Sequence, residues 1–216
     1  FHDLGFTIAP ETMRLMNQLS HSGELSFLAA ERLWVETEKS LNTKTPSMFF
    51  QALEDCGALA ALCPSWHPRG SELKALNQAA DLESSTSIRF ATLMAHQDSA
   101  VIETVCEIFK APNQHRELSL LSARHGIDCH CRNGEHALLL LEHTDAWRRR
   151  DRFEEFLAVC RLTYALREDE AELLKKAVEE THSIDTSDWQ KQGIKGPAMG
   201  ERVRQARLEK LVTLFD

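Results

Sequence analysis

The sequence predicts an all-α protein, an irregular array of many helices without a substantial sheet. The composition favours helix, because Leu occurs 29 times whereas Val and Ile together occur 14 times, with Ala, Glu and Lys abundant in the rest. Apolar residues also recur at three- and four-residue spacing along most of the chain, as on the buried face of a helix. No self-similarity of 34 or 40 residues is visible, so a regular solenoid is not expected.

The N-terminal third is expected to form three short helices. Pro10 suits a first helical turn, where its missing N–H costs nothing, and Gly23 ends that segment. The second helix, over 30–41, presents one apolar face that contains Leu33, Trp34, Thr37 and Leu41. The third opens at Pro46 and stops at Gly57, with a core stripe of Phe49, Phe50, Leu53 and Cys56.

A loop rich in Pro and Gly, residues 64–71 (PSWHPRGS), separates this third from the remainder. Helical periodicity then returns in a series of segments, most of which have capping residues near their starts. These segments are 71–82, 86–95, 99–109, 113–125, 135–143, 149–167 and 169–182. Residues 185–193 lead into the last helix.

The net charge of −8 argues against a nucleic-acid partner, since phosphates are neutralised by Lys and Arg. The distribution of charge matters more than the total. Four arginines against one aspartate occupy 148–152, and six basic against three acidic residues occupy 191–216. The C-terminal third is therefore polarised, as a phosphate-facing surface requires.

The segment 193–209 (GIKGPAMGERVRQARLE) offers a physical route to phosphate binding. Its glycines permit a tight turn before Pro197, and a helix N-terminus presents unpaired N–H groups to an anion. Three arginines follow but cannot share one face, so one or two are expected to form salt bridges. An alternative is that Gly196–Gly200 only allows close helix packing. The candidate phosphate-binding residues are Arg148, Arg149, Arg150, Arg152, Lys195, Gly196, Arg202, Arg204 and Arg207.

The arginine run also has a simpler interpretation as a solvated helix start, with Trp147 as a core anchor. Trp34, Trp66 and Trp189 are interpreted as packing residues rather than base-stacking platforms. Most of the six cysteines are expected in the core, and the compartment is expected to be the cytoplasm, because no disulfide framework, leader or membrane span is visible. The cluster His125, Cys129, His130 and Cys131 lacks the distant second ligand pair typical of zinc, so no metal site is predicted there.

One stretch has an order of residues specific enough to indicate a family. Residues 31–64, which contain ERLWVETEKSL and PSMFFQALEDCGALAALCP, resemble the neck and body of bacterial class II tRNA nucleotidyltransferases, the CCA-adding enzymes, in their proteobacterial form. The resemblance extends to LGFTIAPETMRLMNQLSHSGEL (4–25) and more weakly to TDAWRR (144–149) and 193–209. It implies a neck-like region over 1–63, a body-like region over 64–147 and a tail-like region over 148–216.

The resemblance implies that the intact enzyme adds CCA to tRNA 3′ ends from CTP and ATP with Mg²⁺. The helical part is then expected to hold the backbone of the acceptor and T-arm. The nucleotidyltransfer head is not expected in this chain, because a Gly-Ser turn followed by Asp-x-Asp, which would hold the two metals, does not occur. The chain begins at Phe1 and is interpreted as a truncated, non-catalytic product.

Many proteobacterial CCA-adding enzymes carry an HD phosphohydrolase whose His-Asp doublet follows a segment like RFATL. Here RFATLM (89–94) is followed by Ala95-His96-Gln97-Asp98, so the doublet is absent. The region is interpreted as a metal-free helical counterpart of that domain.

Two other functions stay open. The C-terminal region of a related poly(A) polymerase would share the neck-like motif, although its tail is expected to be strongly basic. A helical interaction or oligomerisation module would instead use Leu-rich runs such as 137–141. Steep salt dependence of tRNA binding would indicate an RNA-binding function, and salt-insensitive self-association would indicate the module.

Overall fold

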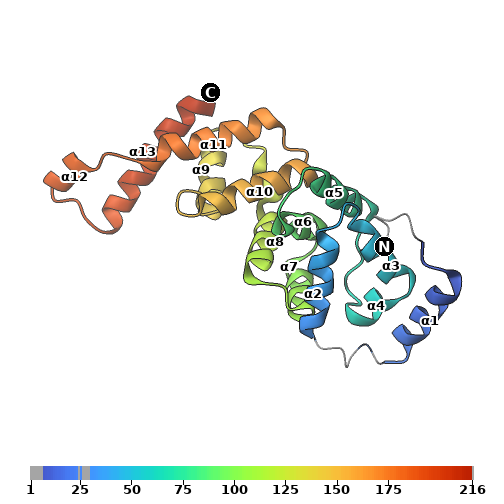
Figure 1. Ribbon diagram of the computed structural model, residues 1–216. Coiled ribbons are helices and arrows are strands. Elements are labelled where there is room, and N and C mark those ends of the chain that lie inside the picture. Colours follow the sequence, from blue (N-terminus) through green and yellow to red (C-terminus); the bar gives the residue numbers. More distant parts are fainter. Residues whose placement is uncertain (1–6, 24, 26–29, 216) are drawn as a thin grey trace. The chain divides into compact units, whose positions relative to one another are not determined.

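The computed structural model describes residues 7–23, 25 and 30–215, and in these residues the regular secondary structure is helical (Figure 1). The predicted all-α class is therefore confirmed. The chain divides into two compact units, residues 1–124 and 125–216. The boundary falls inside the predicted body-like region 64–147, and the division into 1–63, 64–147 and 148–216 stays a prediction.

The first unit consists of short helices joined by tight turns. They are α1 (Pro10–His21), α2 (Ala30–Leu41), α3 (Ser47–Asp55), α4 (Ala58–Leu62), α5 (Gly70–Asp81), α6 (Thr86–Met94), α7 (Ser99–Phe109) and α8 (Asn113–His125). Pro10 is the first residue of α1, as expected. The segment expected to stop at Gly57 does so with φ +74, and α4 follows directly.

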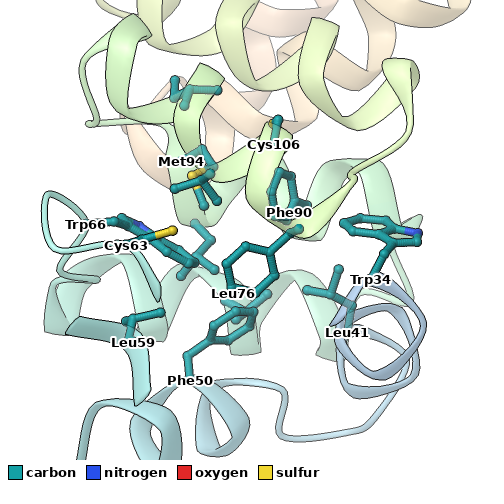
Figure 2. Packing of buried hydrophobic residues seen from close by; sticks show 14 of the residues in the cluster. Trp34, Leu41, Phe50, Leu59, Cys63, Trp66, Leu76, Phe90, Met94 and Cys106 are labelled. Atoms are coloured by element: carbon teal, nitrogen blue, oxygen red, sulfur yellow. The ribbon is translucent and has the colours of Figure 1, made fainter. Parts of the chain in front are cut away.

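Aromatic side chains dominate the core of the first unit (Figure 2). Trp66 is fully buried and makes edge-to-face contacts with Phe50 and Phe109, both at centroid distances of 5.9 Å. Trp34 likewise contacts Phe90 at 5.6 Å. Residues on both sides of the 64–71 loop therefore share one core, and the prediction that these two tryptophans are packing residues is confirmed.

The second unit contains a 3-10 helix, η3 (Gly126–Cys129), and five α-helices. These are α9 (Gly134–His143), α10 (Arg150–Thr163), α11 (Glu168–His182), α12 (Ser187–Lys191) and α13 (Pro197–Phe215). Its core is aliphatic and aromatic, with Leu141, Phe156 and Val159 among the fully buried side chains. Five of the six cysteines are buried and Cys131 is half-buried.

Helix α13 crosses α9 at very close range. A Cβ atom on Gly134, the first residue of α9, would lie 2.4 Å from the backbone nitrogen of Val212, so only glycine fits this crossing. Leu211 is the fully buried side chain of α13. The first half of α13 is mostly exposed and its second half carries the packing.

No helix in the described part of the chain is both long and apolar enough to cross a lipid bilayer.

Candidate functional site

The first predicted basic segment forms the corner between α9 and α10. Asp145 adopts a left-handed φ of +54 in this corner, and its carboxylate pairs with Arg148 at 2.7 Å and with Arg149 at 3.9 Å. The Arg148 side chain is 78% exposed. Arg150 is exposed at the first position of α10. The corner therefore exposes cationic side chains to solvent. The Asp145 carboxylate positions two of them, Arg148 and Arg149.

Arg152 lies one turn into α10 and has a structural contact. Its Nη2 donates to the carbonyl oxygen of Thr144 at 2.8 Å, and the side chain is half-buried. The carbonyl belongs to the residue that ends α9, and a charged donor satisfies one of the carbonyls left unpaired at a helix end. Arg152 thus links the start of α10 to the C-terminal end of α9 and stabilises the corner between them.

Trp147 connects this corner to α13. Its indole Nε1 donates to Thr181 Oγ1 at 2.9 Å, and the guanidinium of Arg207 lies over the ring, with Cζ 3.8 Å from the centroid. Arg207 Nε also donates to the Thr181 carbonyl oxygen at 3.2 Å. Burial lowers the pKa of Arg207, partly offset by the carboxylate of Glu142. Trp147, next to the first basic segment, therefore contacts Arg207 of the second, 60 residues further along the chain.

Further polar contacts fix α13 from Arg204 onwards. Arg204 forms a two-pronged ion pair with Glu142 of α9, with nitrogen–oxygen distances of 2.9 and 3.4 Å. Lys210 Nζ donates to the Glu180 carbonyl oxygen of α11 at 2.9 Å. Arg204 therefore makes a salt bridge of the kind expected for one or two of the three arginines.

The turn before α13 and the start of that helix are open to solvent. Gly193 and Gly196 have left-handed φ values of +81 and +59, which explains the need for glycine there. A Cβ on Gly196 or Gly200 would meet no atom within 4 Å of the described structure. Close helix packing is therefore not the reason for these two glycines. Lys195 and Arg202 are exposed.

Apart from Gly196, the predicted residues divide into two groups. Arg204 and Arg207 face α9 and α11 and are engaged with protein, as is Arg152. Exposed cationic side chains face solvent at the corner, in the turn before α13 and in the first half of α13: Arg148, Arg149, Arg150, Lys195 and Arg202. Which of them contact RNA stays a prediction.

Residues 95–98 of the first unit, where the sequence lacks the His-Asp doublet of an HD domain, form a turn with structural contacts. His96 is exposed and Asp98 is the N-cap residue of α7. The side-chain amide of Gln97 donates to both carboxylate oxygens of the buried Glu72, at 2.9 and 3.2 Å. Glu72 also accepts the Arg69 backbone N–H at 2.8 Å. These contacts fix the 95–98 turn against α5.

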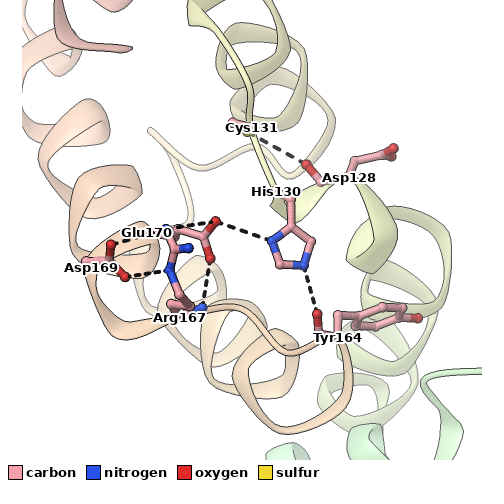
Figure 3. A network of polar contacts seen from close by, with 7 residues as sticks. All are labelled: Asp128, His130, Cys131, Tyr164, Arg167, Asp169 and Glu170. Carbon is pink, nitrogen blue, oxygen red and sulfur yellow. Dashed lines mark hydrogen bonds and ion pairs between the residues drawn. The ribbon is translucent and has the colours of Figure 1, made fainter. Parts of the chain in front are cut away.

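The His125–Cys131 cluster begins at the last residue of α8 and continues through η3 into the following loop, where Figure 3 shows His130 and Cys131. Cys129 is buried against Cys160 of α10, whereas His130 Nε2 donates to the Tyr164 carbonyl oxygen at 2.8 Å. Cys131 Sγ contacts the Asp128 carbonyl oxygen at 3.7 Å. Within the described residues, no three His, Cys, Asp or Glu side chains are grouped to hold a metal ion.

The partners that fix α13 could not be identified from the sequence. Glu142 and Thr181 carry no motif, and their roles depend on contacts to Arg204 and Arg207, which are distant in the sequence. Trp147 was expected as a core anchor and is half-buried, with one face covered by Arg207. The only local signal was an aromatic residue beside an arginine run.

The exposed side chains Arg148, Arg149, Arg150, Lys195 and Arg202, here called the basic surface, belong to an all-helical fold. Comparison with known proteins indicates the RNA-binding class. Residues 5–69 match a family described as "Probable RNA and SrmB- binding site of polymerase A". This match lies in the first unit, whereas the predicted phosphate-binding residues lie in the second.

The chain is also related over nearly its whole length to the CCA-adding enzymes. It is 34% identical to a CCA-adding enzyme of Coxiella burnetii over 97% of this chain and 57% of that protein. The corresponding values are 36%, 96% and 58% for a CCA-adding enzyme of Pseudomonas putida, and 32%, 97% and 62% for a multifunctional CCA protein of Aliivibrio salmonicida. The resemblance predicted from the sequence is confirmed. The chain spans about three fifths of the length of these relatives, and no solved structure matches it.

Proposed function

We propose that this chain is the tRNA-holding helical part of a CCA-adding enzyme, which extends tRNA 3′ ends with CCA from CTP and ATP. The observation that carries the proposal is the Trp147–Arg207 contact, because it brings two basic segments of an acidic chain into one compact unit. The similarity to CCA-adding enzymes along almost the whole chain supports tRNA as the RNA.

Recognition is expected to depend on shape and backbone. Double-helical RNA hides its base edges in a deep, narrow major groove, so a helical protein contacts mainly phosphates and 2′-hydroxyl groups. Arg148, Arg150, Lys195 and Arg202 supply exposed cationic donors for this purpose.

Nucleotidyl transfer itself is assigned to the part of the enzyme that this chain does not match. The chain has no Asp-x-Asp sequence, and its described residues group no three possible metal ligands. These residues do not fit a Mg²⁺–triphosphate site, so no catalytic step is derived from them. The cytoplasm, where tRNA matures in bacteria, is the proposed compartment.

Binding of tRNA can be compared with binding of an unstructured RNA of equal length at two salt concentrations. We expect preferential binding of folded tRNA that weakens steeply as salt rises, since each neutralised phosphate releases a counterion. Salt-insensitive self-association without tRNA binding would instead identify an interaction module. Equal binding of both RNAs would favour the alternative raised by the polymerase A match, a general RNA-binding region.

The combined variant Arg150→Glu and Arg202→Glu tests whether these two arginines contact the tRNA backbone. Both side chains are exposed, and an acidic residue at the start of α10 suits the helix dipole, so the fold should persist. Affinity for all tRNAs should fall alike, with the salt slope reduced by about one per lost phosphate contact. Lys74→Glu, a matched reversal on the exposed face of α5, is the control. A changed preference among tRNA species would contradict backbone recognition.

A further inference from the structure

The second unit contains a cavity of about 510 Å³ whose wall shares no residue with the basic surface described above. It lies between η3, the loop that follows it and α9. Its apolar wall is formed by Ile127, Leu139 and Leu140. A cavity of this volume is within the range used by small ligands.

The apolar part of this cavity is unusually exposed. The Ile127 side chain is 72% exposed and Leu139 is 43% exposed, so two large apolar residues face the opening. His143, which also lines the cavity, stacks on His125 with 5.1 Å between ring centroids and 30° between planes. The wall therefore combines aliphatic side chains with the His143 imidazole, which is held in place by stacking on His125.

Cationic groups lie on the same wall. Arg132 is exposed, and His130 is held with Nε2 donating to Tyr164 O and with Nδ1 3.5 Å from a Glu170 carboxylate oxygen (Figure 3). Because both ring nitrogens face oxygen acceptors, the pKa of His130 is raised, first by the bond to Tyr164. The carboxylate among the lining residues, Asp128, lies 3.7 Å from His125 Nδ1.

We propose that this cavity binds one unpaired nucleotide, with its base against Ile127, Leu139 and the His143 ring and its phosphate at Arg132. Proteins recognise splayed-out bases by stacking them on aromatic side chains, histidine included, and bind the adjoining phosphate with cations. A purely apolar partner would leave Arg132 unused, and a metal ion lacks a ligand set among the described residues. The proposal adds to the backbone contacts of the proposed function and does not depend on them.

The nucleotide can come from single-stranded RNA or from a free mononucleotide, and the same chemistry serves both. The experiment titrates the full chain with AMP and, separately, with a single-stranded RNA hexanucleotide, following the histidine ring signals by NMR. We expect shifts at the cavity histidines His130, His136 and His143 with either probe. Tighter binding of the hexanucleotide identifies RNA as the source, and equal binding identifies the mononucleotide.

Two variants test the proposed contacts, that of Arg132 with the phosphate and that of Ile127 with the base. Arg132→Glu should weaken both probes at least tenfold, and Ile127→Ala should weaken them several-fold. Both side chains are exposed, so neither change disturbs the core. Lys74→Glu, in the first unit, is the matched control and should leave both affinities unchanged.

The proposal is overturned if neither probe shifts the cavity histidines at millimolar concentration, or if Arg132→Glu binds both probes as the unmodified chain does. Either result would leave tRNA binding at the basic surface intact. Failure of the proposed function would look different, because salt-sensitive tRNA binding would be absent while the nucleotides still shifted the cavity histidines.

Discussion

The guanidinium of Arg207 lies 3.8 Å from the centre of the Trp147 ring, and both residues also bond to Thr181. One threonine of α11 therefore serves two partners: its hydroxyl accepts the indole N–H and its carbonyl accepts the guanidinium. Arg207, which stays a predicted phosphate-binding residue, covers an aromatic ring and fixes the last helix against α11.

The Trp147–Arg207 pair should show energetic coupling. A cation over an indole contributes about 0.5–2 kcal/mol, depending on its desolvation. Trp147→Leu and Arg207→Gln, singly and together, should give a coupling energy of about 1 kcal/mol in urea unfolding of the second unit. The matched pair Trp147→Leu with Arg202→Gln should be additive, because Arg202 is exposed on another face of α13. If the effects of both pairs of substitutions are additive, the stacking of Arg207 on Trp147 makes no net contribution to the free energy of unfolding.

Two glycines make a matched test of the α9–α13 crossing. Gly134→Ala would place a methyl group 2.4 Å from the Val212 nitrogen, so α13 must shift and the second unit should lose about 1–3 kcal/mol or more. Gly200→Ala meets open space inside an exposed helix and should gain up to about 1 kcal/mol. Urea unfolding measures both changes. Equal effects of the two substitutions would contradict the close crossing.

Stability of the first unit should depend on pH through His115. This side chain is buried beside Trp34, at a centroid distance of 4.7 Å, and burial lowers its pKa to about 4. The unfolded chain has the ordinary value of about 6.5 and so binds more protons between the two values. Stability is therefore complete above about pH 6.5 and falls as pH drops towards 4, by up to about 3 kcal/mol.

Unfolding by urea at several pH values measures this loss. His115→Phe keeps the aromatic packing and removes the titrating group, and it should flatten the profile between pH 6.5 and 4. A profile that keeps its slope in this variant would assign the acid sensitivity to other groups.

Arg89 should be essential to the first unit. It is buried in α6, and it donates to the carbonyl oxygens of Leu41 at 2.5 Å, Thr43 at 3.2 Å and Ser84 at 2.8 Å. Burial lowers its pKa, and Glu83 partly opposes this. Arg89→Met leaves buried carbonyls unpaired, so it should cost about 3 kcal/mol or more in urea unfolding. The exposed Arg32→Met change is the control and should cost less than about 0.5 kcal/mol.

Local signals explain how much of the fold could be predicted. Pro10 and Gly57 act within their own turns, so the boundaries that they mark agree with the structure. The helix predicted over 149–167 ends at Thr163, because Ala165 takes a left-handed φ of +56 and the Leu166 N–H bonds back to the Cys160 carbonyl oxygen. An alanine gives no sequence signal for such a turn.

The candidate site was harder to predict because its organisation is tertiary. The basic segments were identifiable from charge alone, but the sequence could not show that Arg204 pairs with Glu142, 62 residues away. The nucleotide cavity was not predicted at all. His143 and His136 belong to a helix whose buried face is made of leucines, and only the turn of η3 brings Ile127 and His130 beside them.

The contacts of α13 begin at Arg204 and continue through Arg207, Lys210 and Leu211. A helix is stiff over such a length and turns about 100° per residue. The anchored part of the helix, from Arg204 to Leu211, therefore fixes the directions in which the side chains of the exposed first turns point. The contacts with Trp147 and Glu142 thus determine where Arg202 and the Gly196 turn face. Inserting one residue between Val203 and Arg204 would leave every anchor in place and swing the solvent-facing cations by about a quarter of a turn.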